Sequence, residues 1–171
     1  MKYVYLLTGR PGSGKTSLIK QLVAQMSGQA GGFYTEEIRS GGGRVGFRLV
    51  TLDGEEAVLS HVKLRSPYRV SKYGVNIDSL DQVGVSAITK AAQEHKLIVI
   101  DEIGKMELFS RNFRDAVTGI IDSNQKVLGT ITLSSDPWID TIKRHPRVNL
   151  VTVTRGNQQQ ILKELSTWLN S

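Results

Sequence analysis

The sequence predicts an α/β domain in which a mostly parallel sheet has helices on both faces and carries an inserted antiparallel β-meander. Three observations lead to this prediction. A glycine-rich loop follows an apolar run near the N-terminus, apolar strands then alternate with amphipathic helices, and a turn-rich segment interrupts the alternation between residues 31 and 59. Alternating strands and helices favour a parallel sheet that is covered on both faces. We therefore expect a single domain over residues 1–171, a length that one hydrophobic core supports.

The glycine-rich loop reads Gly9-Arg10-Pro11-Gly12-Ser13-Gly14-Lys15-Thr16. It follows the apolar run Tyr3–Leu7 and precedes apolar residues that recur at helical spacing up to Met26. This context fits a phosphate-binding loop, in which backbone N–H groups and a helix N-terminus bind phosphate oxygens. We expect Lys15 to bind the β- and γ-phosphates and the Thr16 hydroxyl to coordinate Mg²⁺. The nucleotide-binding candidates here are Gly9, Arg10, Pro11, Gly12, Ser13, Gly14, Lys15, Thr16 and Ser17.

The segment after the first helix predicts the β-meander. Phe33–Arg39 and Arg44–Val50 have the composition of strands, and the flexible turn Ser40–Gly43 separates them. The dipeptide Asp53-Gly54 is a hairpin signal, and Ala57–Leu59 is expected to form a third short strand. The meander therefore lies between the phosphate loop and the next parallel unit.

The second half of the chain alternates helices and strands. Residues 61–77 are basic and less regular, and no element is assigned to them. Three helices are expected to begin at the capping residues Asp78, Ser110 and Asp136, and Asn157 is expected to start a fourth. Strands are expected at residues 97–100, 126–132 and 148–154. Ligands bind at the carboxyl ends of parallel strands, so the residues after these strands should line one site.

Two acidic residues, Asp101 and Glu102, follow the apolar strand at residues 97–100. An acid at the end of a buried parallel strand indicates a Walker B motif, in which Asp101 holds Mg²⁺. Glu102 is suited to act as the general base that activates an attacking water. The alternative is a pair of acids that are merely solvated at a strand end. The candidate catalytic residues are Lys15 and Glu102, the candidate metal ligands are Thr16 and Asp101, and the expected cofactor is Mg²⁺.

Three further polar residues are candidates for supporting roles. Thr130 lies in the strand after Walker B, where it could sense the γ-phosphate or hold the water, and an ordinary strand residue is an equal alternative. Arg39 and Arg44 of the meander could supply positive charge to the transition state, as an arginine finger does. The alternative for each arginine is an ordinary surface residue.

Composition restricts the remaining function classes. The absence of cysteine excludes disulfides, thiolate metal sites and a cysteine nucleophile. No apolar run reaches the length of a membrane span and no long apolar signal region is present, so we expect a cytoplasmic protein without a membrane partner. The net charge of +6 suits nucleoside triphosphates as partners. Nucleic acid is possible but not favoured, because few aromatic residues are placed to stack bases, and a monomer is expected.

Four stretches of the sequence together resemble a known family. They are residues 9–16, 32–39, 44–47 and 101–108, and the last of them reads Asp101-Glu102-Ile103-Gly104-Lys105-Met106-Glu107-Leu108. The chain is similar in them to the THEP-type nucleoside-triphosphatases, which include the cancer-related nucleoside-triphosphatase. The resemblance implies a P-loop NTPase fold and Mg²⁺-dependent hydrolysis of ATP, GTP and other NTPs to NDP and phosphate, with broad base tolerance. The nucleotide-binding candidates outside the loop are Asp101, Glu102, Ile103, Gly104 and Asn157.

One departure from the family pattern lies after the last strand. The family usually has Asn-Arg there, whereas this sequence has Asn157-Gln158. Any contact that the arginine makes with the base or a phosphate is therefore replaced or absent in this chain.

Two other function classes stay open from the residues alone. A small nucleotide or metabolite kinase shares the loop, the metal and the fold, and needs an acceptor pocket that the meander and residues 65–72 could form. An NTP-gated switch that binds RNA or protein would use slow hydrolysis to reset itself. Phosphate release from a panel of NTPs, with and without acceptors and RNA, separates the three classes.

Overall fold

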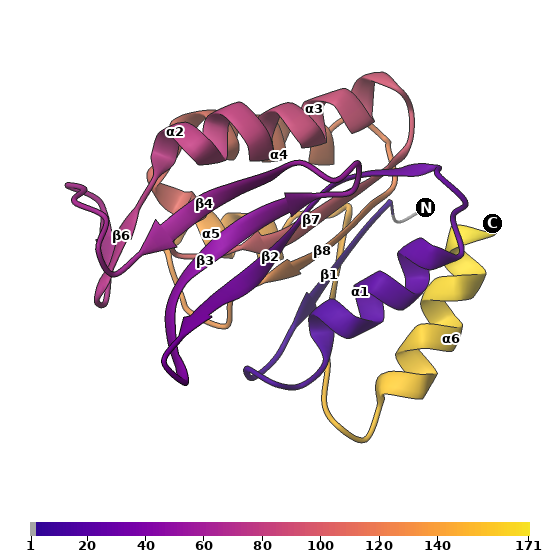
Figure 1. The fold of residues 1–171 in the computed structure, drawn as a ribbon. Helices are drawn as coiled ribbons and strands as arrows, with labels where there is room; N and C mark the ends of the chain where they lie inside the picture. The colour runs from indigo at the N-terminus through magenta and orange to yellow at the C-terminus, as the bar shows by residue number, and fades with distance from the viewer. Residues whose placement is uncertain (1–2) are drawn as a thin grey trace.

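The computed structural model describes residues 3–171, and their strands form one mixed sheet (Figure 1) in the order β5-β6-β4-β3-β2-β7-β8-β1-β9. The strands are β1 (Val4–Thr8), β2 (Ala30–Ser40), β3 (Gly43–Thr51), β4 (Glu56–His61), β5 (Arg69–Val70), β6 (Tyr73–Val75), β7 (Leu97–Ile103), β8 (Val127–Ile131) and β9 (Val148–Thr152). Neighbours from β2 to β9 pair in parallel, and neighbours from β5 to β2 pair antiparallel. The predicted α/β class is thus confirmed.

The antiparallel part of the sheet is larger than the sequence indicates. Residues 69–75, to which no element is assigned from the sequence, add β5 and β6 to its edge. The meander is also continuous with the parallel part, because β2 belongs to both. Residues 30–33 pair in parallel with β7, and residues 33–40 pair antiparallel with β3. The meander therefore extends the sheet beside the strand that carries Asp101.

The helices cover both faces of the sheet. They are α1 (Lys15–Ala24), α2 (Ile77–Ser79), a π-helical segment η1 (Leu80–Val85), α3 (Ser86–Gln93), a single 3₁₀ turn η2 (Glu107–Phe109), α4 (Arg111–Ile121), α5 (Pro137–Lys143) and α6 (Gln158–Leu169). Figure 1 shows α1 and α6 side by side on one face, with α3 and α4 across the sheet from them. Within residues 3–171, no helix combines the length and the apolarity needed to cross a bilayer.

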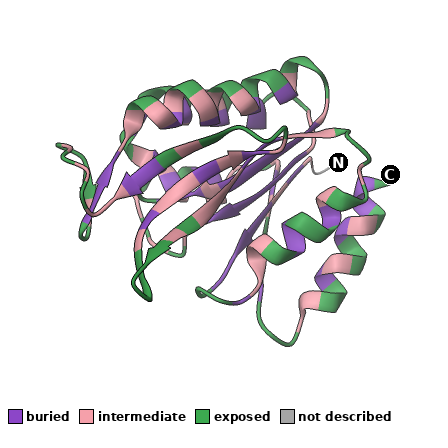
Figure 2. Ribbon diagram, viewed as in Figure 1, coloured by how far each residue is buried: buried purple, intermediate pink, exposed green. Residues whose placement is uncertain are grey.

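The core consists of two apolar layers, one on each side of the sheet. Figure 2 shows the buried residues gathered in the central strands and on the inward sides of the helices. On the α1 side, Leu18, Ile19 and Leu22 are at most 2% exposed and belong to the same buried cluster as Leu7 and Val153. Burying such a side chain stabilises the fold by roughly 1.5–3 kcal/mol. This packing holds α1, and the loop before it, against β1 and the chain after β9.

Two of the three predicted helix caps are confirmed. The Ser110 hydroxyl accepts a hydrogen bond from the Phe113 N–H at 3.0 Å, and the Asp136 carboxylate accepts one from the Trp138 N–H at 2.9 Å. The cap predicted at Asp78 is wrong. The side chain of Asn76 accepts from the Ser79 N–H at 3.0 Å, and Asp78 lies in the first turn of the helix. Asn76 is also a favoured cap residue, and the strand that ends at Val75 places it at the start of the helix.

Candidate active site

The phosphate loop connects β1 to the N-terminus of α1, as the strand–loop–helix pattern predicts. Gly9 has a φ of 146°, and a Cβ there would lie 2.6 Å from the Val153 carbonyl oxygen. Only glycine allows this close approach, so the chain after β9 lies directly against the loop. The Lys15 ammonium crosses the loop and donates to the carbonyl oxygens of Gly9 at 2.7 Å and Arg10 at 3.1 Å. The loop therefore combines a fixed cation with the N-terminus of a helix.

Asp101 connects the loop to the centre of the sheet. Its carboxylate accepts hydrogen bonds from the hydroxyls of Thr16 at 2.8 Å and Thr130 at 2.7 Å. The Thr35 hydroxyl donates to its backbone carbonyl at 2.6 Å, and the peptide bond from Asp101 to Glu102 is cis. Asp101 is 4% exposed, and burial raises the pKa of its carboxyl, with the Thr130 and Thr16 hydroxyls opposing the shift. The two hydroxyl groups thus hold the carboxylate in one orientation.

The donor set at Thr16 and Asp101 fits Mg²⁺. This ion is commonly held by one or two carboxylates together with substrate phosphates and waters. Among residues 3–171 no cluster of three or more His, Cys, Asp or Glu side chains has the geometry of a metal site. A buried carboxylate without a cation is unfavourable, and a divalent ion bound beside Asp101 would compensate its charge. The protein would then supply two oxygen ligands and leave the other positions to phosphate and water.

Two glutamates lie beyond Asp101 and line the same cavity. Glu102 is half-buried, whereas Glu107 is 3% exposed. Burial raises the pKa of Glu102, and the negative charge of Asp101 raises it further. Burial also raises the pKa of Glu107 well above its ordinary value, with Glu102 as the next cause. A carboxylate with a raised pKa is a better proton acceptor, as a general base requires.

Two cavities flank the phosphate loop. The loop cavity, of about 580 Å³, is lined by Gly9, Arg10, Pro11, Gly12, Ser13, Leu133, Thr152, Val153, Thr154 and Arg155. The meander cavity, of about 640 Å³, is lined by Pro11, Thr35, Arg44, Phe47, Leu59, Val70, Ser71, Lys72, Tyr73, Glu102, Lys105, Met106, Glu107, Thr132 and Ser134. Pro11 lines both cavities. The loop thus separates a space beside the chain after β9 from a space beside Glu102.

The two arginines proposed from the meander lie in different places. Arg44 lines the meander cavity, where it bonds the Tyr73 hydroxyl at 3.0 Å and stacks over the Phe47 ring at 4.9 Å. Arg39 lines neither cavity and pairs with Glu37 at 2.9 Å, with 61% of its side chain exposed. Of the two, only Arg44 shares a cavity with Glu102.

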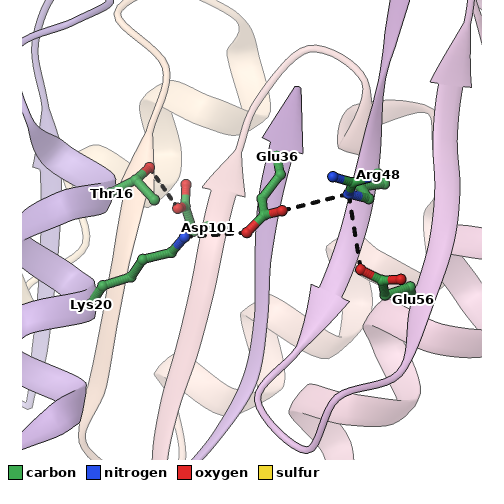
Figure 3. A network of polar contacts seen from close by, with 6 residues as sticks. All are labelled: Thr16, Lys20, Glu36, Arg48, Glu56 and Asp101. Carbon is green, nitrogen blue, oxygen red and sulfur yellow. Dashed lines mark hydrogen bonds and ion pairs between the residues drawn. The ribbon is translucent and has the colours of Figure 1, made fainter. Parts of the chain in front are cut away.

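An exposed row of charges crosses the sheet from α1 to the meander (Figure 3). Glu36 lies between Lys20 at 3.2 Å and Arg48 at 3.5 Å, and Arg48 also lies 4.0 Å from Glu56. Exposed pairs of this kind contribute about 0–1 kcal/mol each. The row begins next to Thr16 and Asp101 in Figure 3, so it borders the candidate metal site. Glu36 is engaged by two cations and is poorly placed to act as an alternative base.

The remaining nucleotide-binding candidates differ in whether they lie at the cavities. A Cβ at Gly104 would lie 2.6 Å from Glu102 Oε1, so glycine leaves room for that carboxylate. The Ile103 side chain is fully buried in the core, and Ser17 is exposed on α1 and lines neither cavity. The Asn157 side chain accepts from the Thr154 N–H at 2.8 Å and donates to the Thr152 carbonyl at 2.9 Å. Asn157 therefore shapes the wall of the loop cavity.

Gln158 is a contact of the phosphate loop that the sequence reasoning missed. Its side-chain amide donates to the Ser13 carbonyl at 2.5 Å, and a Cβ on Gly14 would lie 2.6 Å from its Nε2. Its position next to Asn157, where the related family has arginine, was the available signal. In this chain the neutral amide of Gln158, the first residue of α6, stabilises the loop by a hydrogen bond.

Comparison with known proteins finds similarity over almost the whole chain. A family model described as NTPase matches residues 4–166. The nucleoside-triphosphatase THEP1 of Thermotoga sp. (strain RQ2) is 51% identical over 160 residues, which are 94% of this chain and 91% of that protein.

Two solved structures share the fold. The crystal structure of THEP1 from the hyperthermophile Aquifex aeolicus superposes with a TM-score of 0.91 at 37% identity, over 98% of this chain and 99% of that chain. The solution structure of a human cancer-related nucleoside triphosphatase superposes with a TM-score of 0.81 at 37% identity, over 99% and 97%. The resemblance inferred from the sequence is thereby confirmed.

Proposed function

This chain belongs to the NTPase family and is an NTP-hydrolysing enzyme, and we propose that it converts ATP, GTP and other nucleoside 5′-triphosphates to NDP and phosphate with Mg²⁺. The observation that carries the proposal is the hydrogen bond of 2.8 Å between Thr16 Oγ1 and Asp101 Oδ2. It joins the phosphate loop to the acid at the end of β7, which are the two parts that an Mg-nucleotide site requires.

The nucleotide is proposed to lie along the phosphate loop. The loop N–H groups and Lys15 bind the triphosphate, and Thr16 and Asp101 hold the metal. Mg²⁺, when bound, neutralises charge on the β- and γ-phosphate oxygens. The loop cavity receives the nucleoside, and its lining combines the loop residues 9–13 with Leu133 and residues 152–155. None of these lining residues is Asp, Glu, Asn or Gln, the side chains that could accept hydrogen bonds from a base amino group through a carboxylate or amide, which supports broad base tolerance.

Hydrolysis is assigned to Glu102. The carboxylate accepts a proton as a water oxygen bonds to the γ-phosphorus, and the bond from that phosphorus to the β–γ bridging oxygen breaks. Lys15 stabilises the charge that grows on the phosphate oxygens. Thr130, proposed from the sequence as a γ-phosphate sensor, is assigned a positioning role, since its hydroxyl already donates to Asp101.

The proposal is tested by phosphate release from ATP, GTP, CTP and UTP, with Mg²⁺ and with a chelator in its place. We expect phosphate release from all four nucleotides with Mg²⁺ and from none of them with the chelator. Glu102→Gln should bind Mg-NTP and lose about 10²–10⁴ in rate. Glu164→Gln, an exposed change on α6, is the matched control and should behave as wild type. Release by Glu102→Gln at the wild-type rate, or no release from any NTP, would refute the proposal.

We also propose that residues 1–171 act as one domain and as a monomer. The single domain is supported by the strands of residues 3–171, which all join the same sheet. Light scattering coupled to size exclusion should give the mass of one chain, with and without Mg-NTP. Added RNA should leave the rate of phosphate release unchanged, and a dimer or stimulation by RNA would contradict these expectations.

A further inference from the structure

The meander cavity is larger than hydrolysis needs. Its volume is about 640 Å³, whereas one water molecule takes up about 30 Å³ of liquid. Cavities that bind small molecules typically have about 300–1,000 Å³. The nucleotide is assigned to the loop and the loop cavity, which leaves the meander cavity free on the far side of Glu102. A second small molecule therefore fits beside the γ-phosphate.

Part of the cavity wall is apolar and rigid. Phe47 and Tyr73 form an edge-to-face pair with ring centroids 5.6 Å apart, and Tyr73 is 4% exposed. Leu59 and Met106 add aliphatic surface. Such a wall suits the carbon skeleton of an organic ligand, because apolar contact is gained without ordering new side chains.

Glu107 is the most deeply buried carboxyl of the cavity. It is 3% exposed, its own backbone N–H donates to the carboxyl, and no side chain among residues 3–171 is seen to donate a hydrogen bond to it. A carboxyl has several acceptor sites, so a ligand that donates a further hydrogen bond here gains affinity. With Glu102 on the same wall, the cavity offers two carboxyls to the hydroxyls of a ligand.

The opening of the cavity carries unpaired positive charge. Lys72 and Lys105 both line it and are exposed, and neither forms an ion pair within residues 3–171. Arg44 also lines the cavity, but its charge is paired with Glu37 at 3.2 Å. This arrangement favours a ligand with an anionic end, which cations attract from solution and hold at the rim.

We propose that the meander cavity binds a phosphate monoester with free hydroxyls and that this molecule accepts the γ-phosphoryl group of the NTP. Its phosphate lies at Lys72 and Lys105, and its hydroxyls face Glu107 and Glu102. A hydroxyl oxygen bonds to the γ-phosphorus, the bond to the β–γ bridging oxygen breaks, NDP leaves, and the hydroxyl proton passes to Glu102. The inference rests on the proposed function, because both reactions use the same loop and base.

The test follows the γ-phosphoryl group with γ-labelled ATP and the full chain. Ribose 5-phosphate and glycerol 3-phosphate represent sugar and polyol phosphates, and AMP represents a nucleoside monophosphate. Separate assays with each compound show which of these classes accepts the phosphoryl group. Ribose lacks the phosphate, and inorganic phosphate lacks the carbon-bound hydroxyls. We expect label in an organic product with at least one monoester and none with ribose or inorganic phosphate. Hydrolysis of ATP with water as the sole acceptor in every arm overturns the inference and leaves the proposed function intact.

Variants show whether the transfer uses this cavity. The double change Lys72→Ala and Lys105→Ala should lower the ratio of transfer to hydrolysis by about tenfold or more, as expected when charge-assisted hydrogen bonds are lost. Lys163→Ala, an exposed change on α6, is the control. Glu107→Gln should lower the same ratio, and the lysine variant keeps the test decisive if this buried change disturbs folding. An unchanged ratio in the lysine variant overturns the assignment of the cavity.

Discussion

Asp101→Asn separates the catalytic role of this residue from its structural role. The carboxylate accepts from two hydroxyls, Thr16 at 2.8 Å and Thr130 at 2.7 Å, and it is 4% exposed. The amide keeps the shape and removes the charge. One carboxylate oxygen becomes an NH₂ group, which donates to its threonine hydroxyl instead of accepting from it, and both hydrogen bonds lose charge assistance worth about 1 kcal/mol each. These two losses bound the expected destabilisation at about 2 kcal/mol.

Burial acts in the opposite direction on the stability of this variant. The pKa of Asp101 is raised, so the folded state binds its proton more tightly than the unfolded state does. The free energy of unfolding therefore falls as the pH rises from the ordinary pKa of an aspartate to the raised pKa of Asp101. This loss of stability persists at neutral pH. Asn removes this deficit, because it carries no charge to bury. The net change in the free energy of unfolding at neutral pH without metal should thus be smaller than 2 kcal/mol.

Activity should fall much further than stability. Loss of one preorganised electrostatic group costs about 10²–10³ in rate, or roughly 2.7–4 kcal/mol. The assay is phosphate release as a function of Mg²⁺ concentration, together with urea unfolding of the metal-free protein. We expect a higher Mg²⁺ concentration at half-maximal rate and partial rescue by excess metal. Asp115→Asn, whose side chain is 71% exposed on α4, is the control. A wild-type Mg²⁺ dependence in Asp101→Asn would refute the metal assignment.

Four further predictions concern the same site. Lys15→Ala should lower phosphate release by about 10²–10³, and near wild-type release would remove the loop from the mechanism. The rate should rise with pH through a midpoint above the ordinary pKa of a glutamate, because Glu102 must be ionised to accept a proton and its pKa is raised. A midpoint at or below the ordinary pKa of a glutamate would point to another base. In single-turnover assays Arg44→Ala should lose more rate than Arg39→Ala, since only the former lines the cavity of Glu102, and equal rates would exclude a catalytic role for the meander. Gln158→Leu should weaken NTP affinity several-fold, because the Ser13 carbonyl loses the hydrogen bond that Gln158 donates at 2.5 Å. The affinity is measured by nucleotide titration, with Gln159→Leu as the control, and an unchanged affinity would mean that the loop keeps its shape without this hydrogen bond.

Local patterns predicted most of the elements, because they depend on neighbouring residues. The glycine spacing before Lys15 and the apolar run before Asp101 indicated both halves of the nucleotide site, and the structure joins them through Thr16. The caps at Ser110 and Asp136 were predicted because a capping side chain binds a backbone group two or three residues away. The edge strands β5 and β6 were missed, since strands of two and three residues carry too little periodicity to recognise.

By itself, the sequence determined the fold class, the phosphate loop and the two acids of β7, all of which are encoded over short stretches of chain. Only the tertiary structure decided which distant side chains share a cavity. It placed Arg44 and Glu107 in the cavity that Glu102 lines, left Arg39 outside it, and brought Gln158 against the loop. Strand order and register determine these contacts, and both result from packing the whole sheet between its two helical layers rather than from any local pattern.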